Sequence, residues 1–284
     1  MHIQRVAVIG AGTMGNGIAH VFALGGIDVA LVDVSDEAVE AGVTMIRKNL
    51  GRQVDKDVIS QAEAGEALDL IHTSTDLEKT VSNVDLVVEA VSERAEVKAD
   101  VFRSIDAAAP PDAILASNTS SISITWIAAQ TQRPSNVIGM HFFNPVPVMK
   151  LVEIVRGLET SDAVFNTVRS LSERLGKSPV EVSDYPGFVS NRVLMPMINE
   201  AVYCVMEGVA SVEDIDHVMK LGMAHPMGPL NLADFIGLDV CLSIMEVLHT
   251  QLGDDKYRPC PLLRKMVTAG RLGRKSGHGF YTYN

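Results

Sequence analysis

Three glycines near the start of the chain have the spacing of a phosphate-binding turn. The segment is Gly10-Ala11-Gly12-Thr13-Met14-Gly15. In this pattern the first glycine allows a tight turn, the second lets a pyrophosphate approach the backbone, and the third lets a helix pack closely on a strand. Unpaired N–H groups at the start of the following helix attract the same phosphates. The spacing therefore predicts a dinucleotide-binding site, and the alternative is a structural turn without a ligand.

An acidic side chain closes the next β-branched segment. Asp33 follows the strand expected over residues 28–32. At that position a carboxylate accepts hydrogen bonds from a ribose diol, and its charge opposes a 2′-phosphate. Asp33 therefore favours NAD over NADP as the cofactor.

A histidine and a glutamate stand where acid–base chemistry would need them. His141 ends a strand expected over 137–141, and Glu153 lies in the next, over 151–155. Open α/β sheets bind ligands at the carboxyl ends of their strands, where the serine-rich segment 116–121 is also expected. A histidine base oriented by a carboxylate suits alcohol oxidation by hydride transfer, which needs no metal. Taken singly, His141 could be a structural group and Glu153 a charge on an edge strand.

Several motifs occur in one order along the whole chain. They are GAGTMG, VVEAVSERAEVK, ASNTSSISI, GMHFFNPVPVMKLVEIV, DYPGFVSNR, HPMGPLNLADFIGLD and GRLGRKSGHGFY. Over essentially all 284 residues the sequence resembles the short-chain L-3-hydroxyacyl-CoA dehydrogenases, and within them the bacterial 3-hydroxybutyryl-CoA enzymes. The resemblance implies NAD-dependent interconversion of (S)-3-hydroxyacyl-CoA and 3-oxoacyl-CoA near butyryl length, with acetoacetyl-CoA as the oxidised partner.

The same resemblance implies roles for individual residues. His141 is then the general base and Glu153 the partner that orients it. Ser120 hydrogen-bonds the substrate oxygen, and Asn191 polarises the substrate from the second domain, which implies a site between two domains. The implied cofactor contacts beyond the glycine turn are Asp33, Glu93, Lys98, Ser120, Asn144 and Lys275.

A basic stretch predicts a contact with coenzyme A. Lys48, Arg52 and Lys56 are spaced i, i+4, i+8 in the helix expected after Ser35, so they share one stripe, with Asn49 beside them. In a chain of net charge −11 this stripe is expected to hold the nucleotide phosphates, and the family resemblance places that end of the coenzyme near this helix. The alternative is a solvated helix face.

The elements that must position these residues predict two domains. Residues 1–184 alternate β-branched runs with helical stretches, as in an α/β Rossmann-type domain with a parallel sheet. Residues 185–284 follow a turn-forming cluster and carry helical periodicity, which predicts an all-α domain for substrate binding and dimerisation. Helices are expected from Ser35 towards Val58, from Phe188, after Ser211 and over 232–248. The strands expected are 5–9, 28–32, 70–73, 84–89, 113–116, 137–141, 151–155 and 179–182.

Composition narrows the classes of function. With 24 Lys and Arg against 35 Asp and Glu, and no basic patch elsewhere, nucleic acid is not an expected partner. No apolar run reaches the roughly 20 residues that span a bilayer, and the N-terminus lacks the features of a signal peptide, so a cytoplasmic protein is expected. The three cysteines have no metal-binding spacing and indicate reduced thiols.

Several alternatives stay open at the level of sequence. The apolar second domain is expected to form a homodimer, as the resemblance implies, although its apolar positions could instead pack only against the first domain. A second enzymatic interpretation is a dehydrogenase of a free hydroxy acid or sugar acid. A third is an NAD-binding structural or regulatory protein without catalysis. Acyl-chain length, substituents and the physiological direction are not decided.

Overall fold

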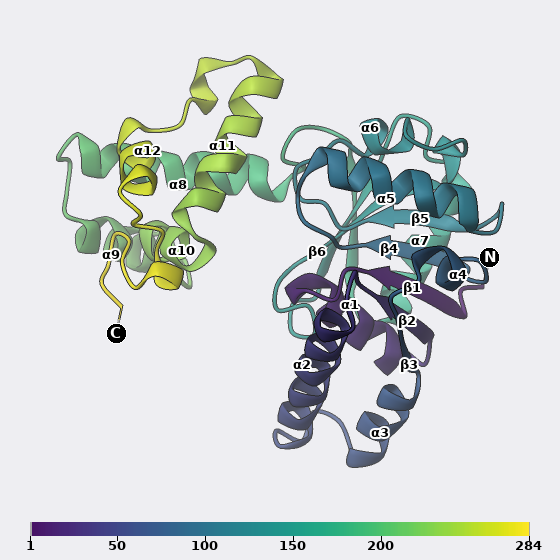
Figure 1. Cartoon of the computed structure of the whole chain (residues 1–284). Coiled ribbons are helices and arrows are strands. Elements are labelled where there is room, and N and C mark those ends of the chain that lie inside the picture. The colour runs from purple at the N-terminus through teal and green to yellow at the C-terminus, as the bar shows by residue number, and fades with distance from the viewer. Residues whose placement is uncertain (1, 284) are drawn as a thin grey trace. The chain divides into compact units, whose positions relative to one another are not determined.

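The computed structural model describes residues 2–283, in two compact units that meet between Asp184 and Tyr185. Unit 1 is built on one eight-stranded sheet in the order β3-β2-β1-β4-β5-β6-β7-β8 (Figure 1). The strands are β1 Arg5–Ile9, β2 Asp28–Val32, β3 Ile71–Ser74, β4 Leu86–Glu89, β5 Ile114–Ser117, β6 Val137–Phe142, β7 Leu151–Arg156 and β8 Ser178–Ser183. Strands β4, β5 and β6 are buried along their whole length, as expected when helices cover both faces of a sheet.

One pair of strands departs from the expected parallel sheet. All neighbours are parallel except β6 and β7, which are antiparallel. Only residues 143–150 connect them, whereas a parallel return needs a dozen or more residues for its crossover. The short connection therefore reverses the chain direction and pairs His141 with Glu153 directly.

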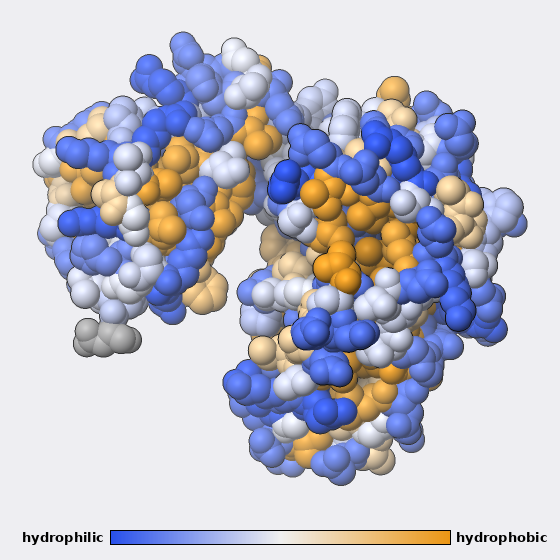
Figure 2. Space-filling model, viewed as in Figure 1, coloured by the Kyte–Doolittle hydropathy of each residue, from blue (hydrophilic) through white to orange (hydrophobic). Residues whose placement is uncertain are grey.

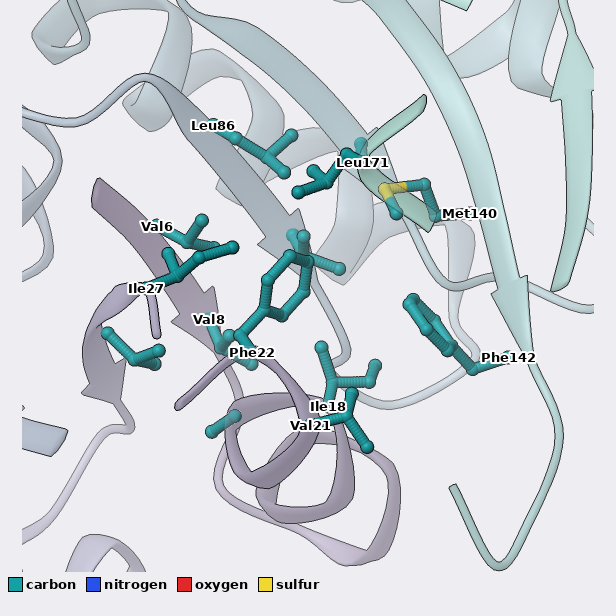
Figure 3. Close-up of a cluster of buried hydrophobic side chains, with 14 of the residues drawn as sticks. Val6, Val8, Ile18, Val21, Phe22, Ile27, Leu86, Met140, Phe142 and Leu171 are labelled. Atoms are coloured by element: carbon teal, nitrogen blue, oxygen red, sulfur yellow. The ribbon is translucent and has the colours of Figure 1, made fainter. Parts of the chain in front are cut away.

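The helices of unit 1 cross between the strands. They are α1 Thr13–Leu24, α2 Asp36–Val54, α3 Gln61–Asp69, α4 Leu77–Val81, α5 Ala95–Ala108, α6 Ile124–Ala128 and α7 Asp162–Arg174, with a 3₁₀ turn η1 at Pro134–Asn136. Helix α1 packs its buried face on the sheet, where Phe22 meets the ring of Phe142 edge-on at 6.4 Å between centroids (Figure 3). This core packs α1 on the sheet, and the glycine turn joins the start of α1 to the end of β1.

Helix α2 is shorter than the sequence indicated. Ser35 caps it as expected, its side chain accepting from the amide of Ala38, but the helix ends at Val54 rather than near Val58. Asp57 takes a positive φ of 54°, and the amide of Val58 bonds back to the carbonyl of Gln53. A left-handed residue followed by such a bond is a usual helix ending, and aspartate tolerates that conformation.

Unit 2 is helical throughout its main elements. They are α8 Ser190–Met206, α9 Val212–Gly222, α10 Pro229–Ile236, α11 Leu238–Leu252 and α12 Pro261–Thr268, with 3₁₀ turns η2 Asp255–Tyr257 and η3 Arg274–Ser276. Ser211 caps α9 as expected. The prediction of a single helix over 232–248 is wrong. Gly237 has a φ of +107° and separates α10 from α11. No helix in residues 2–283 is long and apolar enough to cross a membrane.

Candidate active site

The glycine turn lies between β1 and α1 and is set by backbone crowding. Gly10 has a φ of +100°, and a Cβ there would lie 2.6 Å from the carbonyl oxygen of Ala90. A Cβ on Gly15 would overlap the carbonyl oxygen of Gly10. Gly12 differs, since a Cβ there would meet nothing within 4 Å. The chain itself therefore requires Gly10 and Gly15, whereas Gly12 faces open space in which a phosphate group can approach the backbone.

Asp33 is fixed against the same turn. One carboxylate oxygen accepts from the amide of Ala11 at 2.7 Å, and the other accepts from the amide of Val34 at 2.7 Å. The side chain is half-buried and belongs to the wall of a pocket of about 400 Å³. The two N–H donors hold the acid at the end of β2, in the position from which a diol can donate to it.

The rest of that pocket is mainly apolar. Its walls come from the ends of β1 and β2, from the segment after β4 and from one face of α5, and its apolar side chains include Ile9, Val32, Leu77, Val91, Val97 and Val101. Figure 2 shows hydrophobic surface over β4 and α5 in this unit. An apolar slot with one carboxylate at its mouth suits a flat aromatic base attached to a ribose, so these residues fit NAD.

His141 and Glu153 form a buried pair across β6 and β7. Nδ1 of His141 lies 2.7 Å from Oε2 of Glu153. The residues are only 7% and 2% exposed, so water competes little for either group. The ring of Phe143 packs on the imidazole, with centroids 4.6 Å apart. The carboxylate of Glu153 therefore fixes the orientation of the imidazole ring through Nδ1.

The segment after β5 reaches the same edge of the sheet. Strand β5 pairs with β6 in parallel, with Ser117 opposite Gly139. The side chain of Asn118 accepts from the amide of Phe142 at 2.9 Å, next to His141 in the chain. The structure therefore links the serine segment to the end of the strand that carries the histidine.

Glu93 organises the serine segment. One of its oxygens accepts from the hydroxyl of Thr119 at 2.5 Å and from the amides of Ser120 and Ser121 at 2.9 and 3.1 Å. Its other oxygen lies 3.2 Å from the ammonium of Lys98. Burial raises the pKa of Glu93, but the charge of Lys98 and these donors outweigh it and hold the pKa below its ordinary value.

Lys98 has a different environment from that of a surface cofactor contact. Its side chain is 1% exposed, and its ammonium also lies 2.6 Å from Oε1 of Glu89. Among the other expected contacts in unit 1, Asn144 is exposed and precedes Pro145 through a cis peptide bond. Lys98 is therefore placed to act on Glu93 and Glu89 rather than to reach into the apolar pocket.

Two of the expected site residues belong to unit 2. Asn191 is buried and is the second residue of α8. Lys275 lies in η3 and donates to Asp239 at 2.7 Å. The side chain of Lys275 is thus held by a partner in unit 2.

The prediction that Lys48, Arg52 and Lys56 form one stripe is partly wrong. Lys48 and Arg52 are exposed and one turn apart on α2, and Arg52 donates to Asn49 at 3.2 Å. Lys56 lies beyond the end of the helix, so it does not continue the stripe. The early helix ending at Asp57 separates it from the other two cations.

Glu89 and Asn118 join the site without having been selected from the sequence. Glu89 ends β4, and its only signal was a charge closing an otherwise apolar strand. Asn118 was part of the serine motif but had no assigned role. Both were identified from their hydrogen-bond partners on neighbouring strands, Ser117 for Glu89 and Phe142 for Asn118. Sequence spacing does not give these partners.

Comparison with known proteins gives matches over nearly the whole chain. Residues 5–185 match the 3-hydroxyacyl-CoA dehydrogenase, NAD binding domain, and residues 187–283 match the C-terminal domain of the same family. A probable 3-hydroxybutyryl-CoA dehydrogenase of Bacillus subtilis is 58% identical over 283 residues, covering 100% of this chain and 98% of that protein.

Two further relatives agree with this match. A 3-hydroxybutyryl-CoA dehydrogenase of Clostridioides difficile is 52% identical over 281 residues, covering 99% of this chain and 100% of that protein. The crystal structure of (S)-3-hydroxybutyryl-CoA dehydrogenase from Ralstonia eutropha superposes with a TM-score of 0.97 at 51% identity, covering 100% of both chains. Sequence and fold therefore point to the same group of proteins.

Proposed function

The chain belongs to the 3-hydroxyacyl-CoA dehydrogenase family, whose N-terminal domain binds NAD, and we propose that it interconverts (S)-3-hydroxybutyryl-CoA and acetoacetyl-CoA. The observation that carries the proposal is the buried contact between His141 and Glu153, in a chain 58% identical to a probable 3-hydroxybutyryl-CoA dehydrogenase. NAD, when bound, supplies the acceptor for the hydride from C3 of the hydroxyacyl group.

His141 removes the proton of the 3-hydroxyl group. Its Nε2 accepts that proton, while Nδ1 donates to Glu153, so the charge that develops on the ring meets a carboxylate 2.7 Å away. Ser120 and Asn191 hydrogen-bond the substrate oxygen, which gains negative character as its proton leaves. In the reverse direction His141 returns the proton to the oxygen of the reduced product.

The residues proposed to contact the cofactor lie mainly in unit 1. The turn from Gly10 to Gly15 receives the pyrophosphate, and Asp33 accepts from the ribose and disfavours a 2′-phosphate. Glu93, Ser120 and Asn144 contact the nicotinamide end of the cofactor. Lys275, a residue of unit 2, is a further cofactor contact. Lys98 supports this set by fixing Glu93, to which it lies at 3.2 Å.

Oxidation of NADH in the presence of acetoacetyl-CoA tests the proposal. We expect steady turnover with this substrate, and much less with free hydroxy acids or sugar acids assayed in the oxidative direction. Activity on free acids alone would support the second enzymatic interpretation. Binding of NADH without turnover of any of these compounds would support the third interpretation, an NAD-binding protein without catalysis.

We also propose that α2 docks the nucleotide of coenzyme A. Lys48 and Arg52 present two exposed cations on one helix face, in a chain of net charge −11. Asn49 lies between them, and Lys56 follows on the turn after the helix. Replacing Lys48 and Arg52 with Glu should raise the KM for acetoacetyl-CoA and weaken its dependence on ionic strength. A truncated thioester without the nucleotide is the control, and an equal loss on both thioesters would contradict the dock.

A homodimer through unit 2 completes the proposal. Its helices carry large apolar side chains in contact with solvent, among them Val193 at 67%, Val218 at 61% and Leu221 at 84% exposure. Figure 2 shows hydrophobic surface on this unit as well, over α10 and α11. Light scattering should give twice the mass of the chain, and Leu221→Asp with Val218→Asp should lower it. A monomeric wild-type protein at micromolar concentration would contradict the dimer.

A further inference from the structure

Glu89 lies between the glycine turn and the serine segment 117–121 of unit 1. It is the last residue of β4, with Ile9 opposite it on β1 and Ser117 opposite it on β5. Its carbonyl accepts from the amide of Asn118 at 2.8 Å, and the next amide, that of Ala90, bonds to the carbonyl of Ile9 at 2.7 Å. One residue therefore connects the strand that ends in the glycine turn with the strand that ends in the serine segment.

The carboxylate of Glu89 is fully occupied in the interior. The side chain is 0% exposed. Oε1 lies 2.6 Å from the ammonium of Lys98 and accepts from the amide of Val91 at 2.7 Å. Oε2 accepts from the hydroxyl of Ser117 at 2.6 Å, and that hydroxyl oxygen accepts from the amide of Thr119 at 3.2 Å. Glu89 thus reaches the serine segment by way of Ser117.

A second route runs through Lys98 and Glu93. The ammonium of Lys98 lies between two carboxylates, 2.6 Å from Glu89 and 3.2 Å from Glu93. Glu93 in turn accepts from the backbone of Ser120 at 2.9 Å and of Ser121 at 3.1 Å. Both routes from Glu89 therefore end on the segment 117–121.

The charges make this arrangement rigid. A lysine that is 1% exposed is strongly disfavoured unless a carboxylate compensates it, and Glu89 is the fully buried one of its two partners. Glu89 therefore confines the ammonium to a single place. Since the ammonium fixes one oxygen of Glu93, the other oxygen of Glu93 is left at a defined position to receive the amides of the serine segment.

We propose that Glu89 is a positioning residue for the reaction, which sets Ser120 through Lys98 with Glu93 and through Ser117. The inference rests on the dehydrogenase activity proposed above. Glu89 touches neither substrate nor cofactor in this role. Its effect is to hold the donor of Ser120 before the substrate arrives, and misplacement of such a donor costs turnover more than it costs binding.

The experiment compares two carboxylate-to-amide substitutions in buried ion pairs. Glu89→Gln keeps the size of the side chain but removes the charge that confines Lys98. The control is Asp106→Asn in the same helix as Lys98, where Asp106 pairs with Arg133 at 2.7 Å and the two side chains are 10% and 18% exposed. For Glu89→Gln we expect a kcat about 10- to 100-fold lower, with little change in the KM for acetoacetyl-CoA. Asp106→Asn should lower the unfolding temperature but leave kcat near the wild-type value.

A double mutant distinguishes positioning from general loss of structure. In a Ser120→Ala background, Glu89→Gln should have little further effect on kcat, because the group that it positions is gone. If the two losses multiply instead, Glu89 does not act through Ser120. If Glu89→Gln does not fold, Ser117→Ala removes the shorter route without changing the charge and should also lower kcat.

Hydrogen exchange separates this inference from the proposed activity. The amides of 117–122 should exchange about 10-fold faster in Glu89→Gln than in Asp106→Asn, since they lose charge-assisted support. This readout does not depend on turnover. Wild-type protein without activity on acetoacetyl-CoA would refute the proposed function alone, whereas equal exchange in the two variants, or an unchanged kcat in an active enzyme, would overturn the positioning role.

Discussion

Alanine at Gly12 and alanine at Gly15 should have opposite consequences, although the two residues belong to one motif. A Cβ on Gly15 overlaps a backbone carbonyl, that of Gly10, which cannot rotate away as a side chain would. Such overpacking typically costs about 1–3 kcal/mol, or more where backbone must move. In a chain of this size that corresponds to a loss of roughly 2–12 °C in Tm.

Gly12→Ala should instead leave the fold intact. Gly12 has a φ of −63°, which alanine adopts, and its Cβ would meet nothing within 4 Å. Because alanine reduces the conformational freedom of the unfolded chain, the free energy of unfolding should rise by about 0.4–1 kcal/mol at most. The Tm should therefore stay level or rise slightly. The new methyl group would occupy space left for the pyrophosphate, and the Kd for NADH should rise by about tenfold or more, since each 1.4 kcal/mol is tenfold in affinity.

Differential scanning fluorimetry and titration of NADH fluorescence measure both effects. We expect a lower Tm for Gly15→Ala. For Gly12→Ala we expect a weaker affinity for NADH at an unchanged or slightly higher Tm. If Gly12→Ala bound NADH as tightly as the wild type, the open space beside Gly12 would not be the place where the dinucleotide approaches the backbone. If Gly15→Ala kept the wild-type Tm, the turn would be more plastic than its geometry indicates.

Three further outcomes follow from single side chains. His141→Asn and Glu153→Gln should each lower kcat by about 10²-fold or more in the NADH assay while the Kd for NADH hardly changes, and near-full turnover of either variant would refute the pair. NADH should be preferred over NADPH in kcat/KM, and Asp33→Ala should narrow the ratio; comparable wild-type values for the two cofactors would be the contrary result. Burial lowers the pKa of His20, so protonation on acidification destabilises the fold and stability falls as the pH drops below about 6.5. His20→Gln should flatten the urea-unfolding free energy between pH 7 and pH 5, and an unchanged slope would exclude His20 as the titrating group.

The elements that depend on residues close together in the sequence could be predicted. The turn at Gly10 and the cap at Ser35 depend on residues a few positions apart, and the expected strands agree with the observed ones to within two residues. The ending of α2 was not predictable in the same way, because Asp57 adopts a left-handed conformation that a run of helix-compatible residues does not signal. The placement of Lys56 depended on that ending.

Partners distant in the sequence account for the other differences. Gly237 lies in an apolar pattern that continues through 232–248, and its φ of +107° breaks the helix where Lys275 approaches closely enough that its ammonium would lie 3.1 Å from a Cβ at Gly237. Glu89 resembles any acid at the end of a strand until Lys98 and Ser117 are seen around it. Contacts between residues distant in the sequence create these environments, and helical or strand periodicity carries no information about such contacts.

The antiparallel turn between β6 and β7 has a consequence for the order in which the chain assembles. His141 and Glu153 are 12 residues apart, so a hairpin suffices to bring them together, and hairpins form within about 1–10 μs. Glu89 and Ser117 are 28 residues apart and meet only when α5 has packed across the sheet. We therefore expect the histidine pair to form early and the serine segment late, so that weakened packing of α5 releases the donor before it disturbs the base.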